Sequence, residues 1–156
     1  MGHASDVLPE AAGMSRYVEG VVAEWMRGPR RLPLDYSVES LRLADRIVAG
    51  IRAGRGADEQ AVARALRGVG AYVGEVMVRS GGGSWVDLDD LQRGYFEQPV
   101  GVRMPDGRVW NPLGRAQRRY DRGKGGRESL YVFYLLLHGR LSGLTPRRSQ
   151  TVRTEG

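Results

Sequence analysis

The fold is decided within residues 66–88, LRGVGAYVGEVMVRSGGGSWVDL, where the spacing of apolar residues changes. Up to residue 79 the apolar side chains recur every three or four positions, which is typical of an amphipathic helix. The glycines at 81–83 then interrupt the pattern, and over 85–88 the spacing shifts towards a period of two, as in a short strand. We therefore expect a helix over about 59–79, capped by Asp58, followed directly by a short strand.

The segments on either side show the same two patterns. Apolar stripes with helix stop signals predict further helices over about 14–27, 38–53 and 127–141, with a helix or turn from Pro112 through Tyr120. Ser37 is the expected N-cap of the second of these helices. Strands are expected near 85–88, 99–104 and 107–111, with a hairpin turn at Pro105-Asp106-Gly107. The predicted class is α+β: several helices packed on a small antiparallel sheet.

A single domain is expected from the length of 156 residues. We expect it to span 14–141, between a mobile N-terminal arm at 1–13 and a disordered basic tail at 142–156. The longest apolar run, 130–137, is far shorter than the roughly 20 residues of a membrane-spanning helix. No secretory signal pattern precedes the domain, so we expect a cytoplasmic protein without membrane contact.

The residue types exclude several classes of site. The chain contains no cysteine and only two histidines, His3 and His138. A disulfide scaffold, a cysteine-ligated metal centre, a thiol nucleophile and a multi-histidine metal site are therefore excluded. No metal and no cofactor is expected.

Positive charge is concentrated in the second half of the chain. Residues 1–92 hold 11 arginines and 13 acidic residues, a net charge of −2, whereas 93–156 hold 12 arginines, Lys124 and 5 acidic residues, a net charge of +8. Such asymmetry favours an anionic partner. A GC-rich bacterial genome is the alternative explanation, because Lys124 is the only lysine beside 23 arginines.

Within this half, one basic segment is the candidate binding site. Four arginines recur at a spacing of three or four residues, which would align them along one face of a helix. Two further cations follow in a glycine-rich loop that could hold a phosphate. The candidate ligand- or nucleic-acid-binding residues are Arg115, Arg118, Arg119, Arg122, Lys124 and Arg127. The alternative is a solvated helix face followed by a flexible loop.

Glu75 is the most notable carboxylate, because it lies beside the apolar stripe of the predicted helix 59–79. A half-buried carboxylate is a candidate acid or base. Arg79, four residues later, favours a structural ion pair instead. A hydrogen bond to a buried partner such as Tyr72 or Trp85 is a further structural interpretation.

Two other groups are candidates for reactive or metal-binding residues. The acidic cluster Asp87, Asp89 and Asp90 is interpreted as capping a short helix that begins near Asp89, rather than as a metal site. His138 is interpreted as a residue favourably placed near a helix C-terminus rather than as a metal ligand or catalytic residue.

Four short segments carry a resemblance: LDYS at 34–37, GAYVGEV at 70–76, GSWV at 83–86 and WNPLG at 110–114. Together they resemble a group of small, uncharacterised, largely actinomycete bacterial proteins, classed as domains of unknown function, over about 34–138. The resemblance implies an α+β fold with helices first, then a short sheet, then helices. It also implies that Tyr72, Glu75, Trp85 and Asn111 form one local unit, but it transfers no activity and no catalytic residue.

Three functions follow as hypotheses. The first is a non-enzymatic protein-interaction or accessory module that binds another protein or a second copy of itself. The second is a nucleic-acid or phosphate-ligand binder that uses the arginine-rich segment 115–127. The third, ranked last, is a hydrolase that uses carboxylates such as Glu75.

Overall fold

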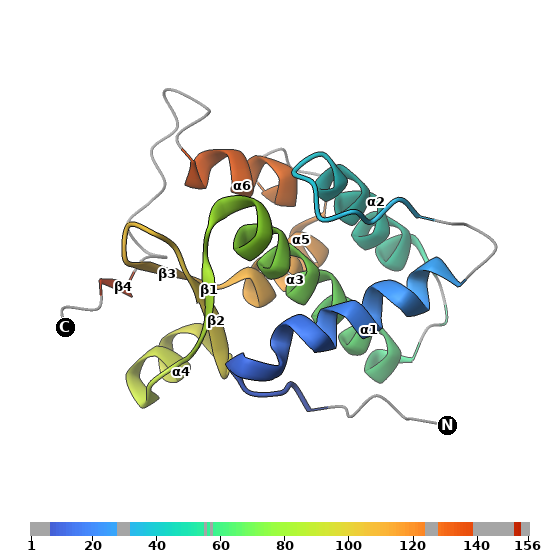
Figure 1. Cartoon of the computed structure of the whole chain (residues 1–156). Helices are drawn as coiled ribbons and strands as arrows, with labels where there is room; N and C mark the ends of the chain where they lie inside the picture. The colour runs from blue at the N-terminus through green and yellow to red at the C-terminus, as the bar shows by residue number, and fades with distance from the viewer. Residues whose placement is uncertain are drawn as a thin grey trace.

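A long central helix, α3 (Glu59–Gly81), organises the fold in the computed structural model. The structure describes residues 7–27, 32–54, 56, 58–123, 128–138 and 152–153. Helices α1, α2 and α5 and strands β1 and β2 all pack against α3 (Figure 1). Besides α3, the elements are η1 (Ala11–Gly13), α1 (Met14–Met26), α2 (Ser40–Ala53), β1 (Ser84–Asp87), α4 (Asp90–Phe96), β2 (Val100–Arg103), β3 (Arg108–Trp110), α5 (Pro112–Arg122), α6 (Leu130–Leu137) and β4 (Val152–Arg153).

The central helix begins and ends as the sequence predicts. The side chain of Asp58 accepts a hydrogen bond from the backbone N–H of Gln60, which satisfies a free donor of the first turn. Gly82 adopts a left-handed φ of 75° at the C-cap, a conformation that glycine tolerates best. Between these ends, an almost continuous run from Leu66 to Met77 is buried, because neighbours pack on several sides of α3.

Two glycines of α3 are required by close packing. A Cβ at Gly70 would lie 2.7 Å from the Cα of Leu113 on α5, and one at Gly74 would lie 2.2 Å from Cη2 of Trp85 on β1. The first glycine thus allows α5 to approach α3 backbone to backbone, and the second accepts the indole ring of the first strand. This explains why α3 contains residues that lower its intrinsic helix propensity.

The sheet is antiparallel, with strand order β1-β2-β3-β4. Trp85 pairs with Val102, which in turn pairs with Trp110. Gly107 turns the chain between β2 and β3 with a φ of 84°, as expected for the predicted hairpin. The α+β class is confirmed, with helices packed on a small antiparallel sheet.

Several boundaries differ from the predictions. Helix α2 begins at Ser40, because residues 37–39 form a preceding turn in which Ser37 Oγ accepts a hydrogen bond from the backbone N–H of Ser40. Ser37 therefore stabilises the entry into α2 without being its N-cap residue, which is Glu39. Helix α6 begins at Leu130 rather than near 127, because Ser129 caps it by accepting from the N–H of Val132.

Two short elements lie in stretches expected to be irregular. The 3-10 turn η1 occupies part of the expected N-terminal arm, and Ala11 N–H donates to Asp87 Oδ1 on β1 at 2.9 Å. Strand β4 occupies part of the expected tail and pairs with β3. Residues 1–6, 142–151 and 154–156 lie outside the described residues. Among the helices in the described ranges, none is long and apolar enough to cross a membrane.

Candidate functional site

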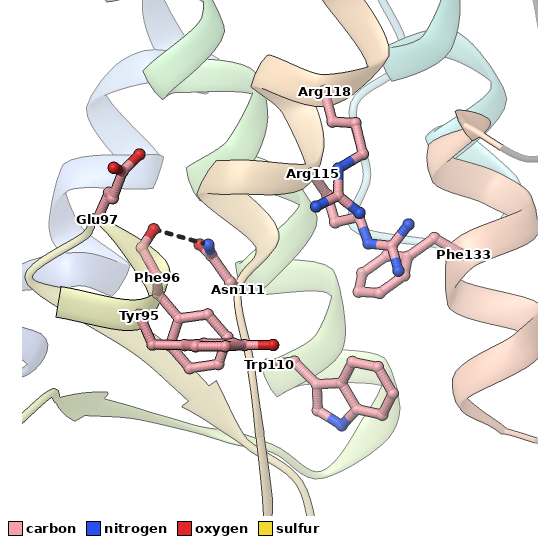
Figure 2. Close-up of a pocket in the computed structure, with 8 residues that line it drawn as sticks. All are labelled: Tyr95, Phe96, Glu97, Trp110, Asn111, Arg115, Arg118 and Phe133. Carbon is pink, nitrogen blue, oxygen red and sulfur yellow. Dashed lines mark hydrogen bonds between the residues drawn. The ribbon is translucent and has the colours of Figure 1, made fainter. Parts of the chain in front are cut away.

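A cavity of about 290 Å³ lies where α4, β3, α5 and α6 meet (Figure 2). We call it the α5 pocket. It is lined by Tyr95, Phe96, Glu97, Trp110, Asn111, Arg115, Arg118 and Phe133. Two of these residues belong to the arginine-rich segment singled out in the sequence, and Asn111 belongs to the predicted local unit.

Arg115 and Arg118 place two positive charges on one side of the pocket (Figure 2). The guanidinium carbon of Arg115 lies 4.6 Å from the centre of the Phe133 ring, in a cation–π contact. The pKa of Arg115 is lowered to about 10, mainly by burial and also by the positive charges of Arg118 and Arg122, against the opposing effect of Glu128. Within the described part of the chain, the side chain of Arg118 forms neither an ion pair nor a hydrogen bond.

Aromatic rings form much of the remaining wall. Tyr95 is 52% exposed, and its ring meets Phe96 edge-on at a centroid distance of 5.1 Å. Trp110 and Phe133 pack edge to face at 5.8 Å. The indole nitrogen of Trp110 is buried and has no acceptor among the described residues, but it points away from the two arginines (Figure 2).

Asn111 holds the two helices that border the pocket. Its Oδ1 accepts from the N–H of Gly114 at 2.9 Å and so caps α5, while its Nδ2 donates to the carbonyl of Phe96 at the end of α4. Glu97 ends α4 with a left-handed φ of 56°, and its carboxylate lies on the opposite side of the view from Arg115 and Arg118 (Figure 2). The positions of α4 and α5 beside the pocket therefore depend on the hydrogen bonds that Asn111 makes to the backbone of both helices.

The predicted basic face does not form as one unit. Successive residues of a helix are rotated by about 100°, so Arg118 and Arg119 face different neighbours. Arg119 is buried, and its Nε lies 3.3 Å from Oδ1 of Asp45 on α2 while its Nη1 donates to the carbonyl of Gly123. Arg122 forms an ion pair with Glu128 at 2.9 Å. Lys124 and Arg127 lie outside the described residues.

Asp45 is a structural residue that the sequence reading missed. Its carboxylate accepts from Ser129 Oγ at 2.7 Å and from the N–H of Leu130 at 2.8 Å, besides its contact with Arg119. It therefore joins the start of α6 to α2 and to α5. Asp45 lies on the polar side of its own helix pattern, and no local signal marks its partner 84 positions later.

Glu75 is a buried, fully engaged carboxylate. It is 1% exposed and accepts hydrogen bonds from Arg79 Nε at 2.9 Å, Trp85 Nε1 at 2.9 Å and Ser15 Oγ at 3.1 Å. The predicted ion pair with Arg79 and hydrogen bond with Trp85 are confirmed. The alternative partner, Tyr72, is wrong.

The predicted four-residue unit is instead divided into three places. Tyr72 directs its hydroxyl to Ser40 Oγ at 2.6 Å and accepts from the N–H of Tyr36 at 3.0 Å. Asn111 lies in the α5 pocket. Among the four, a hydrogen bond is found between Glu75 and Trp85, and it joins the end of α3 to the strand that follows it.

The acidic cluster and His138 have structural contacts. Asp89 forms a capping box with Gln92 at the start of α4, as predicted, and Asp87 binds the backbone of η1. In the described ranges, no three His, Cys, Asp or Glu side chains are grouped so that they could hold a metal ion. His138 ends α6, with its ring centre 4.5 Å from that of Tyr134.

The residues that complete the α5 pocket were missed at the sequence level. Tyr95 and Phe133 come from segments on either side of the arginines, and no periodic pattern links them. Trp110 stands in the sequence analysis only as the first residue of the WNPLG segment at 110–114. Comparison with family models, with curated proteins and with solved structures gives no significant match for this chain.

Proposed function

We propose that this chain is a non-enzymatic binding module that holds an anionic group of its ligand in the α5 pocket. One observation carries the proposal: Arg115 and Arg118 bring two guanidinium groups to one side of a cavity whose other walls are largely aromatic. The pKa of Arg115 is lowered mainly by burial and in part by the neighbouring positive charge of Arg118, because two adjacent cations repel each other. An anion bound between them would relieve that repulsion and accept the planar donors of both groups.

An enzymatic role has less support. The buried carboxylate best placed for acid–base chemistry, Glu75, already accepts three hydrogen bonds from its own chain. Both of its oxygens are therefore occupied by donors of the fold, which leaves little capacity for contact with a substrate. The hydrolase hypothesis therefore ranks below binding, as it did from the sequence.

A cytoplasmic location of the protein stays a prediction.

A second candidate function is a protein-interaction module that uses α4. Leu91 is 78% exposed and Tyr95 is 52% exposed, and they lie four residues apart on the same face of this short helix. Large exposed apolar side chains in such a pair are favourable contacts for another protein or a second copy of the chain. Sedimentation of the wild type and of Leu91→Ser at high concentration tests the second copy. Self-association that this substitution abolishes would favour this candidate.

The primary proposal is tested by binding of inorganic phosphate at low ionic strength, measured by amide chemical shifts in an NMR titration. We expect shifts around the α5 pocket, and Arg118→Gln should weaken the affinity roughly tenfold through loss of a charge-assisted hydrogen bond. The matched control is Arg16→Gln, which removes one charge from an exposed position of α1.

Two outcomes would overturn this proposal. One is the absence of saturable shifts in the wild type. The other is an equal loss of affinity in both variants, which would show a general charge effect rather than a site.

A further inference from the structure

The α5 pocket is richer in aromatic side chains than the rest of the chain. Four of its eight lining residues are aromatic, whereas aromatic residues make up 8% of the sequence. Both phenylalanines of the chain are among them. An anion alone would need only the arginines, so this wall indicates that the ligand also carries a flat or apolar group.

Tyr95 is the ring best placed to contact such a group. Phe133 already stacks with Arg115 and packs against Trp110. Phe96 is largely buried and meets Tyr95 through an edge contact. Because about half of Tyr95 is exposed, part of its ring surface is available to a planar ligand.

The size of the cavity limits how much of a ligand it can hold. Its volume of about 290 Å³ lies at the lower end of the range for small-molecule sites. That space suits a ligand no larger than one nucleotide, and not an extended segment of several residues or bases. Guanidinium groups next to an exposed aromatic ring are the combination that proteins use for phosphate and base together.

Resting on the proposed function, we infer that the α5 pocket binds one nucleotide, with its phosphate at Arg115 and Arg118 and its base against Tyr95. The phosphate accepts hydrogen bonds from the two guanidinium groups on the α5 side. The base stacks on the exposed face of Tyr95, a contact that tolerates any base because each has a π-face. The same chemistry is presented by a free nucleoside monophosphate and by the phosphorylated end of a single strand.

Isothermal titration calorimetry tests the inference with AMP, ribose 5-phosphate and adenosine. We expect AMP to bind about tenfold or more tightly than ribose 5-phosphate, because only AMP has a base to stack. Adenosine, which lacks the phosphate, should bind at least tenfold more weakly than AMP. A single-stranded oligonucleotide, with and without a 5′-phosphate, forms the second arm of the experiment.

Variants of Tyr95 separate stacking from phosphate binding. Tyr95→Leu should lower AMP affinity about tenfold and leave ribose 5-phosphate affinity within about twofold, while Tyr95→Phe, which retains the ring, should preserve both. Arg118→Gln should weaken both ligands. Because Tyr95 is exposed, we expect its variants to keep the circular dichroism spectrum and melting temperature of the wild type.

The outcomes distinguish the inference of nucleotide binding from the proposal of anion binding on which it rests. If AMP and ribose 5-phosphate bind equally, or Tyr95→Leu weakens both equally, the pocket binds phosphate without a base and the inference is overturned. If neither ligand binds, or Arg118→Gln changes neither affinity, the anion site itself is refuted. If AMP binds and a 5′-phosphorylated strand binds more tightly still, the ligand is a strand end, and the reverse order identifies a free nucleotide.

Discussion

Replacing Glu75 with glutamine should destabilise the protein much more than the loss of one surface charge. Its Oε1 accepts from Arg79 Nε, and its Oε2 accepts from Trp85 Nε1 and Ser15 Oγ. A carboxylate can serve donors at both ends, whereas an amide has one oxygen and one NH₂ group. In Glu75→Gln, the NH₂ group must therefore face either Arg79 or Trp85, and one donor loses its acceptor.

The cost follows from these contacts. A hydrogen bond to a charged group contributes about 1.5–3 kcal/mol, and a buried donor left without an acceptor costs about 1–3 kcal/mol. Arg79 is partly exposed and can turn towards water, so the larger penalty falls on Trp85. We expect a loss of about 3 kcal/mol in the free energy of unfolding, which corresponds to a fall of about 6–12 °C in melting temperature.

Urea unfolding followed by circular dichroism measures this loss, and Trp85→Phe provides the decisive comparison. Phenylalanine removes the indole N–H, so Glu75→Gln no longer leaves that donor unpaired. In the Trp85→Phe background, Glu75→Gln should cost about 1–2 kcal/mol less than in the wild type. The matched control is Glu19→Gln, which removes the other carboxylate partner of Arg79 at an exposed position and should cost under about 0.5 kcal/mol.

Additive losses in the double variant would show that Glu75 and Trp85 do not act together, and the reasoning would fail. A change below about 0.5 kcal/mol for Glu75→Gln alone would also refute it, because a buried carboxylate with three donors should not tolerate an amide so easily.

Three further predictions concern the close packing of Gly74, the hydrogen bonds from α6 to Asp45, and the pH dependence of stability. Gly74→Ala should lower the free energy of unfolding by about 2 kcal/mol or more, because the added Cβ would lie 2.2 Å from Trp85. The control is Gly20→Ala, where nothing lies within 4 Å of the added Cβ, and this variant should raise the free energy of unfolding by about 0.5–1 kcal/mol. Thermal melts measure both changes. Asp45→Asn weakens the acceptor for the first turn of α6, so hydrogen exchange of the α6 amides should become about tenfold faster while that of α3 changes little. Burial raises the pKa of Tyr72, so the folded state retains a proton that the unfolded state loses above about pH 10, and stability should fall as the pH rises above 10. Urea melts between pH 9 and 11 check this, with Tyr72→Phe expected to show a shallower decline; equal slopes would contradict it.

Features encoded by neighbouring residues were predictable from the sequence. The caps at Asp58 and Asp89, the turn at Gly107 and the change from helix to strand all depend on residues within one or two turns of each other. The close approach at Gly70 was also predictable, since glycine inside a helix has a cost that packing must offset.

Contacts between distant segments were not predictable in the same way. Arg119 shares a basic pattern with Arg118, yet a carboxylate 74 positions earlier, on Asp45, lies within reach of it. Helical periodicity places a side chain on a face but does not identify the helix that lies against it. Only part of the α5 pocket was therefore predictable. Its two arginines lie in one segment of the sequence, whereas Tyr95 and Phe133 join them through tertiary packing.

The contrast between Glu75 and Arg118 supports locating the function in the α5 pocket. Both are charged groups near the interior, but Glu75 is surrounded by three donors of its own chain, so its charge serves the fold. Arg118 lies beside a second arginine at a cavity, and the described part of the chain supplies it with no carboxylate. Like charges side by side oppose folding, so the neighbouring arginine adds to the cost of leaving Arg118 without an acceptor. An anionic ligand at this hollow lined by aromatic rings would supply the acceptor that the described part of the chain does not give to Arg118.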